Sequence, residues 1–284
     1  MGLRIYSFLW AMLFLATFGL VTPALARPLD EIMRSGELRL CISGDHLALT
    51  NATARTFARY LGVTPHIIHL NSWDQQFHDR DRVTHKFRAY IPALLADGRC
   101  DIYPNDIELF AWRMNMLTIT PLFATRMTVV VPQSVLQPIR SLQDLGGKRT
   151  LVAPTSSAHD WLKQQNQFVF KEHPLIIAFD STDHSVESLS REEIDFSILS
   201  AQEVFRQTQI RLLAIKVAFP VGNIQQVGWG THPEHHQLRN KLVEFFTLQR
   251  VPGSLFDYLW EQHVGIALSA FNLFITSTPG GGEH

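Results

Sequence analysis

The sequence has few cysteines and almost no net charge. Two cysteines occur among 284 residues, and 25 Lys and Arg residues nearly balance 26 Asp and Glu residues. This balance gives no reason to expect nucleic acid as a partner, because surfaces that bind nucleic acid are basic. The histidines are scattered and lack a cysteine or carboxylate at metal-ligand spacing. The chain also lacks a nucleophile motif and a Gly-rich nucleotide loop, so we expect no metal, no cofactor and no catalytic residue.

Long apolar runs are also scarce, and the longest lies near the N-terminus. Arg4 gives this segment a positive start, residues 8–21 are apolar, and Ala24 and Ala26 are the small residues of a cleavage site. A membrane anchor needs about 20 apolar residues, so the shorter run predicts a secretory signal at residues 1–26 that is cleaved after Ala26. No cysteine follows that site, so we do not expect a lipoprotein. We expect the protein to act in the periplasm.

The stretch 87–132 contains a predicted helix, two predicted strands and the loop between them. Residues 89–97 have apolar side chains at helical spacing and stop at a glycine. Residues 100–104 are typical of a buried parallel strand, and residues 127–131 form a second apolar run that is long enough to cross between two bodies. The loop 105–113 follows the carboxyl end of the first strand, which is where ligands bind in open α/β sheets.

Strand–helix–strand patterns recur along the rest of the chain. They predict parallel sheets with right-handed crossovers. We expect two α/β lobes, with residues 27–131 and 221–284 in the first lobe and residues 132–220 in the second, so that the chain crosses between them twice. Lobes joined in this way close over a ligand by hinge motion. Gly222 and Gly228 would give the second crossing its backbone freedom.

The stretch 87–132 also resembles part of the periplasmic solute-binding proteins of the amino-acid type (family 3). The features that carry the resemblance are Leu95, Gly98, Asp101, Arg113, Pro121 and residues 128–131. Further pieces at residues 29–40, 142–152 and 186–199 follow in the order of that family, so the resemblance spans nearly all of the mature chain. It implies the two-lobe (type II) periplasmic binding protein fold, a small-molecule solute, and a membrane permease of an ABC importer or a membrane sensor as partner. We expect a monomer.

The same resemblance implies a ligand site. Arg113 is in the place of the arginine that binds the ligand's α-carboxylate in that family, and a planar guanidinium can bind a carboxylate with two parallel hydrogen bonds. Thr155, Ser156 and Ser157 match the helix start of the second lobe, where hydroxyls and N–H groups suit an anion. These residues predict a carboxylate-bearing solute. The alternative is that Arg113 forms a structural salt bridge with a nearby acid.

Three departures from the family pattern change the expected chemistry. Asp106 and Glu108 stand where the family presents hydroxyl and backbone groups, and two acids in a cleft would favour an amine, a cation or a sugar hydroxyl; both could equally be exposed loop acids. Ser200 replaces the acid that meets the ligand's α-amino group. The segment that usually supplies a covering aromatic is short, so residues 73–86 are either a solvated loop or an insertion in which Trp73 or Phe77 takes that role.

The two cysteines, Cys41 and Cys100, fall on strands that would be neighbours in the resembled fold. They could form a disulfide in an oxidising compartment or remain as buried thiols. The pair is similar to one in the binding-protein-like component that accompanies methanol dehydrogenases. Three functions therefore compete. The leading one is a solute-binding protein, the second is a dehydratase-like enzyme on the same fold with Asp106 and Glu108 as acid and base, and the third is an accessory protein that docks on a periplasmic dehydrogenase.

Overall fold

A computed structural model describes residues 26–43, 47–134, 139–154 and 156–277. The helices are α1 (Leu29–Ser35), α2 (Leu47–Leu61), α3 (Ala93–Ala96), α4 (Ala111–Met114), α5 (Ser157–Phe168), α6 (Thr182–Ser190), α7 (Ala201–Phe205), α8 (His236–Gln249), α9 (Leu255–Val264) and α10 (Leu268–Ser277). The strands are β1 (Glu37–Ile42), β2 (Thr64–His69), β3 (Ile102–Glu108), β4 (Thr118–Pro132), β5 (Arg149–Val152), β6 (Ile176–Phe179), β7 (Ser197–Ser200) and β8 (Ile215–Thr231). Short helical turns are η1 (Trp73–Phe77), η2 (Leu142–Leu145) and η3 (Arg206–Ile210). Nearly all of the predicted signal segment and Thr155 lie outside the described residues.

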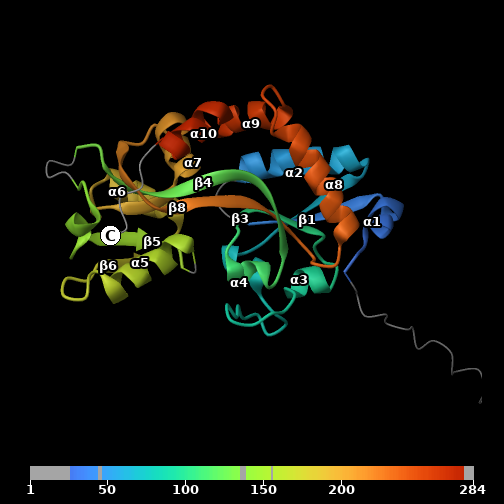
Figure 1. Ribbon diagram of the computed structural model, residues 1–284, viewed down its shortest axis with the longest axis horizontal. Coiled ribbons are helices and arrows are strands. Elements are labelled where there is room, and N and C mark those ends of the chain that lie inside the picture. The colour runs from blue at the N-terminus through green and yellow to red at the C-terminus, as the bar shows by residue number, and fades with distance from the viewer. Residues whose placement is uncertain (1–25, 44–46, 135–138, 155, 278–284) are drawn as a thin grey trace, which may run out of the picture.

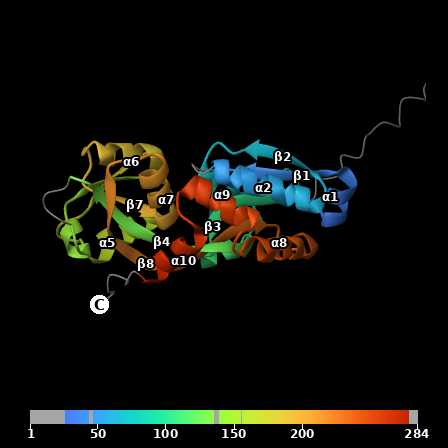
Figure 2. The same ribbon diagram turned by 90° about the horizontal axis from the view of Figure 1, so that it is seen from above.

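Two long strands join two bodies. A six-stranded sheet has the order β2-β1-β3-β8-β4-β7, and β5 and β6 form a separate parallel pair. The strands β1, β2 and β3 are parallel, whereas β8 runs antiparallel to both β3 and β4. Figures 1 and 2 show β4 and β8 running side by side along the molecule, with β1 to β3 in one body and β5 to β7 in the other. Each body is therefore an α/β lobe, and the chain crosses between them on these two strands.

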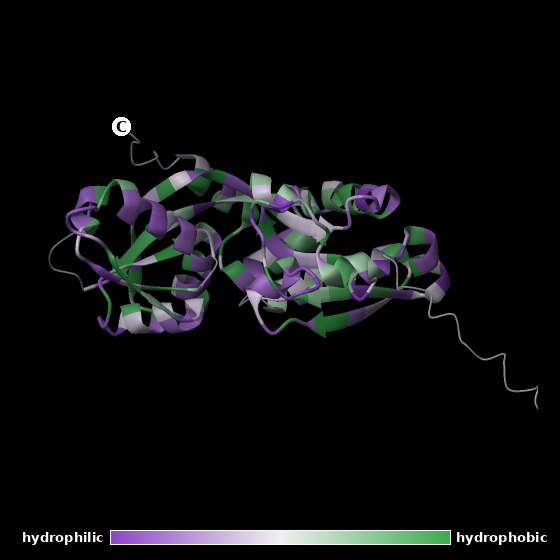
Figure 3. Ribbon diagram, turned by 90° about the horizontal axis from the view of Figure 1, so that it is seen from below, coloured by the Kyte–Doolittle hydropathy of each residue, from purple (hydrophilic) through white to green (hydrophobic). Residues whose placement is uncertain are grey.

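Each lobe has its own apolar core, and Figure 3 shows green strands inside the second lobe with purple residues on its outer helices. The largest core belongs to the first lobe and is rich in aromatic rings, among them Phe57, Trp229 and Phe246. The C-terminal helices pack on this core and also reach the second lobe, where Phe271 and Phe274 lie 6.0 and 5.1 Å from the ring of Phe205. The predicted lobe boundaries at residues 131 and 220 remain a prediction.

Two local predictions from the sequence are wrong. The helix expected over residues 89–97 is only α3, because Pro92 is its N-cap and the residue before a proline disfavours helical dihedrals. The segment 105–113 is not simply a loop. Strand β3 continues through Glu108 by pairing with β8, and α4 then contains Arg113.

None of the helices in the described ranges combines the length and the apolar character that a membrane span requires.

Gly228 is needed in the crossing for a reason other than backbone freedom. Gly222 has the positive φ of +66° that favours glycine, but Gly228 does not. A Cβ at position 228 would overlap the carbonyl group of Thr120 on the paired strand β4. Close approach of β4 and β8 therefore requires glycine there.

We predict that Gly228→Ala lowers the free energy of unfolding by about 1–3 kcal/mol, because the backbone of β4 must move. Urea denaturation followed by circular dichroism measures this. Gly146→Ala is the matched control, since its Cβ would meet only ordinary contacts of 3.5 Å or more. Equal stability of the two variants would contradict the prediction.

Candidate functional site

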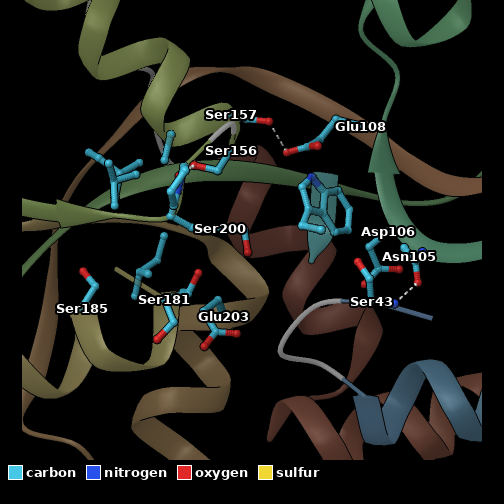
Figure 4. A pocket seen from close by; sticks show the side chains of 18 of the residues that line it. Ser43, Asn105, Asp106, Glu108, Ser156, Ser157, Ser181, Ser185, Ser200 and Glu203 are labelled. Carbon is cyan, nitrogen blue, oxygen red and sulfur yellow. Dashed lines mark hydrogen bonds between the residues drawn. The ribbon is translucent and has the colours of Figure 1, made fainter. Parts of the chain in front are cut away.

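A cavity of about 740 Å³ lies between the two lobes, which is within the usual size range for small-molecule sites. Side chains of both lobes line it, as Figure 4 shows. The first lobe contributes Ser43, Asn71, Trp73, Asp74, Asn105, Asp106 and Glu108 among others. The second lobe contributes Ser156, Ser157, Asp180, Ser181, Ser185, Ser200, Gln202 and Glu203 among others. The lining therefore presents many hydroxyl and carboxyl groups among apolar side chains.

The strand ends explain why these residues meet. Ser43 directly follows β1, Asp180 directly follows β6, and Ser200 ends β7. All three residues line the cavity, so the strand ends that carry them face each other across it. Asn105 of β3 fixes the first-lobe edge, because its side chain accepts from the N–H of Ser43 at 2.9 Å and donates to the carbonyl of Cys41 at 3.0 Å.

Asp106 reaches the cavity through an irregularity in β3. The pairing of β3 with β8 shifts between Tyr103 and Ile107, and Asp106 has a φ of +50°. Asp is one of the few non-glycine residues that tolerate this region. Bulges of this kind re-aim a side chain, and Asp106 lies beside Asn105 and Ser43 in Figure 4.

Glu108 connects the lobes. Its Oε1 accepts from the hydroxyl of Ser157 at 2.7 Å, and its Oε2 accepts from Nη1 of Arg113. Arg113 is only 1% exposed and does not line the cavity. Its guanidinium lies 5.0–5.3 Å from the ring centroids of Phe77, Phe110 and Trp112, which is the range of cation–π contacts.

The comparisons with known proteins place this arrangement among solved structures. No protein-family model and no curated protein matches the chain. A variant of ArgBP from T. maritima is 18% identical, with 84% of this chain and 99% of that chain covered and a TM-score of 0.65. An amino-acid ABC transporter substrate-binding protein from Streptococcus pneumoniae, bound to L-arginine, is 13% identical, with 84% and 97% covered and a TM-score of 0.67. The ancestral amino-acid-binding protein AncCDT-1, a precursor of cyclohexadienyl dehydratase, is 16% identical, with 83% and 99% covered and a TM-score of 0.65.

The fold is that of the two-lobe, type II periplasmic binding proteins. The fold implied by the resemblance in the sequence is thereby confirmed. These identities are low, so the likeness concerns the fold. The cleft of a type II binding protein lies between the lobes, which is also where this cavity is found.

Within this fold, Arg113 forms the ion pair with a nearby acid that the sequence analysis gave as the alternative, and its ligand-binding role stays a prediction. Its guanidinium is bonded to Glu108, and Nη2 lies 3.5 Å from the hydroxyl of Ser157. The space that the sequence assigned to a ligand carboxylate, between Arg113 and Ser157, therefore contains the carboxylate of Glu108. We call this space the anion position.

The other predicted site residues line the same cavity. Thr155 lies outside the described residues. Trp73, Ser200 and Asp106 line the cavity. Ser156 also lines it and caps α5, accepting from the N–H of His159 at 3.1 Å. The sequence analysis missed many lining residues with polar side chains, among them Ser43, Ser181, Ser185, Gln202 and Glu203. Ser43 and Ser181 could have been found, because each lies within two residues of the carboxyl end of a strand, β1 or β6.

The insertion at residues 73–86 contacts both the cavity and the opposite lobe. Trp73 packs edge to face on Phe77, with ring centroids 6.2 Å apart, and lines the cavity. At the other end of the insertion, Nζ of Lys86 lies 2.6–2.7 Å from the carboxylate of Asp160 on α5. The insertion is therefore not only a solvated loop.

Cys41 and Cys100 form a disulfide with a Cα–Cα distance of 5.7 Å. It ties β1 to the start of β3, next to the edge that carries Ser43 and Asn105. Within the described residues, no group of three or more His, Cys, Asp or Glu side chains could bind a metal ion. The rings of His232 and His235 stack at 4.6 Å, and burial lowers the pKa of His235 to about 4.

The charged side chains that line the cavity in the described part of the chain are all acids. The lining includes five acids and, in the described part of the chain, no Lys or Arg side chain. Glu203 is paired with Arg206 outside the cavity, at 2.6 and 3.0 Å. Hydrogen bonds from the N–H of Ser181 and the ring of His184 lower the pKa of Asp180, so this acid is ionised at neutral pH.

Proposed function

We propose that this chain binds a small solute between its lobes, outside the cytoplasm, and delivers it to the permease of an ABC importer or to a membrane sensor. The observation that carries the proposal is the cavity of about 740 Å³ lined by polar side chains from both lobes. The structural neighbours support it, because they include arginine-binding and other amino-acid-binding proteins. The signal predicted at residues 1–26 is consistent with export and remains a prediction.

The sequence favoured a more specific version of this proposal, in which the solute bears a carboxylate. It requires that the solute displace Glu108 from the anion position and bind Arg113 itself. A dehydratase-like enzyme and an accessory protein of a dehydrogenase remain the alternative functions. Each gives a different result with small molecules, namely binding without turnover, turnover, or neither.

We predict that one compound of a metabolite panel raises the melting temperature of the purified mature protein. A ligand at about 100 times its Kd adds about 2.7 kcal/mol to the free energy of unfolding. For a chain of this size the melting temperature then rises by about 5–10 °C. A thermal-shift screen followed by calorimetry measures the effect, and chromatography of the incubated compound detects turnover. A panel without any stabilising compound would favour the accessory protein, and conversion of the compound would favour the enzyme.

A further inference from the structure

We infer that the solute of this cleft carries an amine or guanidinium cation and no carboxylate group. The inference rests on the proposed function, since it names the class of solute that the same cleft binds. Three features of the cavity support it: the carboxylate of Glu108, the sign of the lining charges, and one buried hydroxyl group.

The anion position is filled by the chain itself. Ser157 donates to one oxygen of Glu108 at 2.7 Å, and Arg113 donates to the other. These are charge-assisted contacts, which are stronger than hydrogen bonds between neutral groups. A ligand carboxylate could bind there only by displacing Glu108, which would then be an unpaired carboxylate beside other acids. Glu108 therefore acts in place of the carboxylate that a solute would otherwise supply.

The remaining charges favour a cation. Asp74, Asp106 and Asp180 line the same cavity as Glu108, and the described lining contains no Lys or Arg side chain. Asp74 and Asp180 each contact a histidine ring outside the lining, that of His78 and that of His184. At an effective dielectric constant of about 20, a unit charge on the solute that lies several ångströms from an acid of the lining changes the affinity for that solute by about tenfold or more. An ammonium group is attracted by this lining, whereas a second carboxylate on the solute is repelled.

A buried hydroxyl group marks where a cation would bind. Ser43 is 8% exposed and lines the cavity, and its Oγ has no hydrogen-bond partner among the described residues. A buried polar group without a partner is costly, and a ligand N–H can satisfy it. Figure 4 shows Ser43 beside Asp106, so one ammonium or guanidinium group could donate to both.

Acids also line the opposite side of the cavity. Figure 4 shows Ser181 and Glu203 of the second lobe across from Asp106 of the first, and Asp180 precedes Ser181 in the chain. An elongated solute with a cation at each end would place positive charge near both groups of acids. Agmatine and 1,5-diaminopentane have this form.

The test compares matched pairs of compounds that differ only by the carboxylate. Agmatine is arginine without its carboxylate, and 1,5-diaminopentane is lysine without its carboxylate. Calorimetry at pH 7 and low salt with the mature protein should give at least a tenfold lower Kd for the amine of one pair or both. This comparison uses the wild-type protein, so it does not depend on how any variant folds.

Variants at position 108 test the role of the carboxylate. Glu108→Ala empties the anion position, so the affinity for arginine should rise relative to agmatine by about tenfold. Glu108→Gln keeps the position filled and should leave arginine the weaker ligand. Asp106→Asn should weaken agmatine binding about tenfold, whereas Glu261→Ala, which removes an exposed acid of α9, should not. Circular dichroism of each variant checks that it is folded.

The outcomes separate this inference from the proposed function. Equal or tighter binding of arginine and lysine by the wild-type protein would overturn the inference, because the solute carboxylate would then have displaced Glu108. Binding of a neutral sugar or an acid, with none of the four compounds bound, would also overturn it. Both of these outcomes leave the proposed function standing. Failure of every small molecule in the panel to bind would overturn both.

Discussion

Replacing Arg113 with alanine is expected to lower the free energy of unfolding by about 3–5 kcal/mol. The guanidinium is 1% exposed, lies against three aromatic rings and is bonded to Glu108. Removing one partner of a buried pair leaves the other charge uncompensated and empties the space between the rings. Arg113→Lys should recover part of the loss, because a point charge keeps the ion pair without the planar geometry.

Guanidinium denaturation with and without each substitution measures this loss. Arg34→Ala is the matched control, since Arg34 is also paired with a carboxylate, at 3.2 Å, but its side chain is 73% exposed. Exposed pairs of this kind contribute about 0–1 kcal/mol. If Arg113→Ala unfolds like the wild type and instead loses solute affinity, Arg113 is a ligand anchor, and the role inferred here for Glu108 is wrong.

Removing the disulfide is expected to cost about 4 kcal/mol. Cys41 and Cys100 are 59 residues apart in sequence, and closing a loop of that length restricts the unfolded chain by about this amount. The double variant Cys41→Ala, Cys100→Ala should therefore unfold at a lower denaturant concentration than the oxidised wild type. Alanine is chosen because both positions are buried and a serine hydroxyl there would need a partner.

Reducing agent provides the control for this prediction. It should destabilise the wild type and leave the double variant unchanged. Mass spectrometry of the wild type after alkylation without reductant should show no modified cysteine. Two alkylated thiols, or equal stability of the wild type and the variant, would contradict the prediction.

The elements that depend on local chemistry could be predicted from the sequence. Ser156 was expected at a helix start because serine hydroxyls cap helices, and it does cap α5. The crossing at residues 127–131 was expected because a β-branched run follows the switch-point loop, and it lies within β4. The start of the helix before residue 97 was misplaced, because apolar spacing was given more weight than Pro92.

The features that depend on contacts between distant residues could not be predicted. The sequence predicted that Arg113 ends the loop at the cleft. Its burial, however, depends on contact with Phe77, which lies 36 positions earlier in the chain. Glu108 and Ser157 belong to different lobes, and the sequence does not show how close the two lobes lie. Their hydrogen bond could therefore not be predicted. Of the acids that line the cleft, Asp106 and Glu108 were predicted from the sequence. The pairing of Glu108 with Arg113, and of Glu203 with Arg206, emerged only from the structure.

A crystal structure of the protein grown with agmatine tests the central claim most directly. We predict agmatine between the lobes, with one cationic group bonded to Asp106 and the hydroxyl of Ser43, and with Glu108 still bonded to Arg113 and Ser157. Two results together would contradict the account. The cleft would hold no agmatine in the first crystals, and crystals grown with arginine would show the arginine carboxylate bonded to Arg113 and Glu108 turned away.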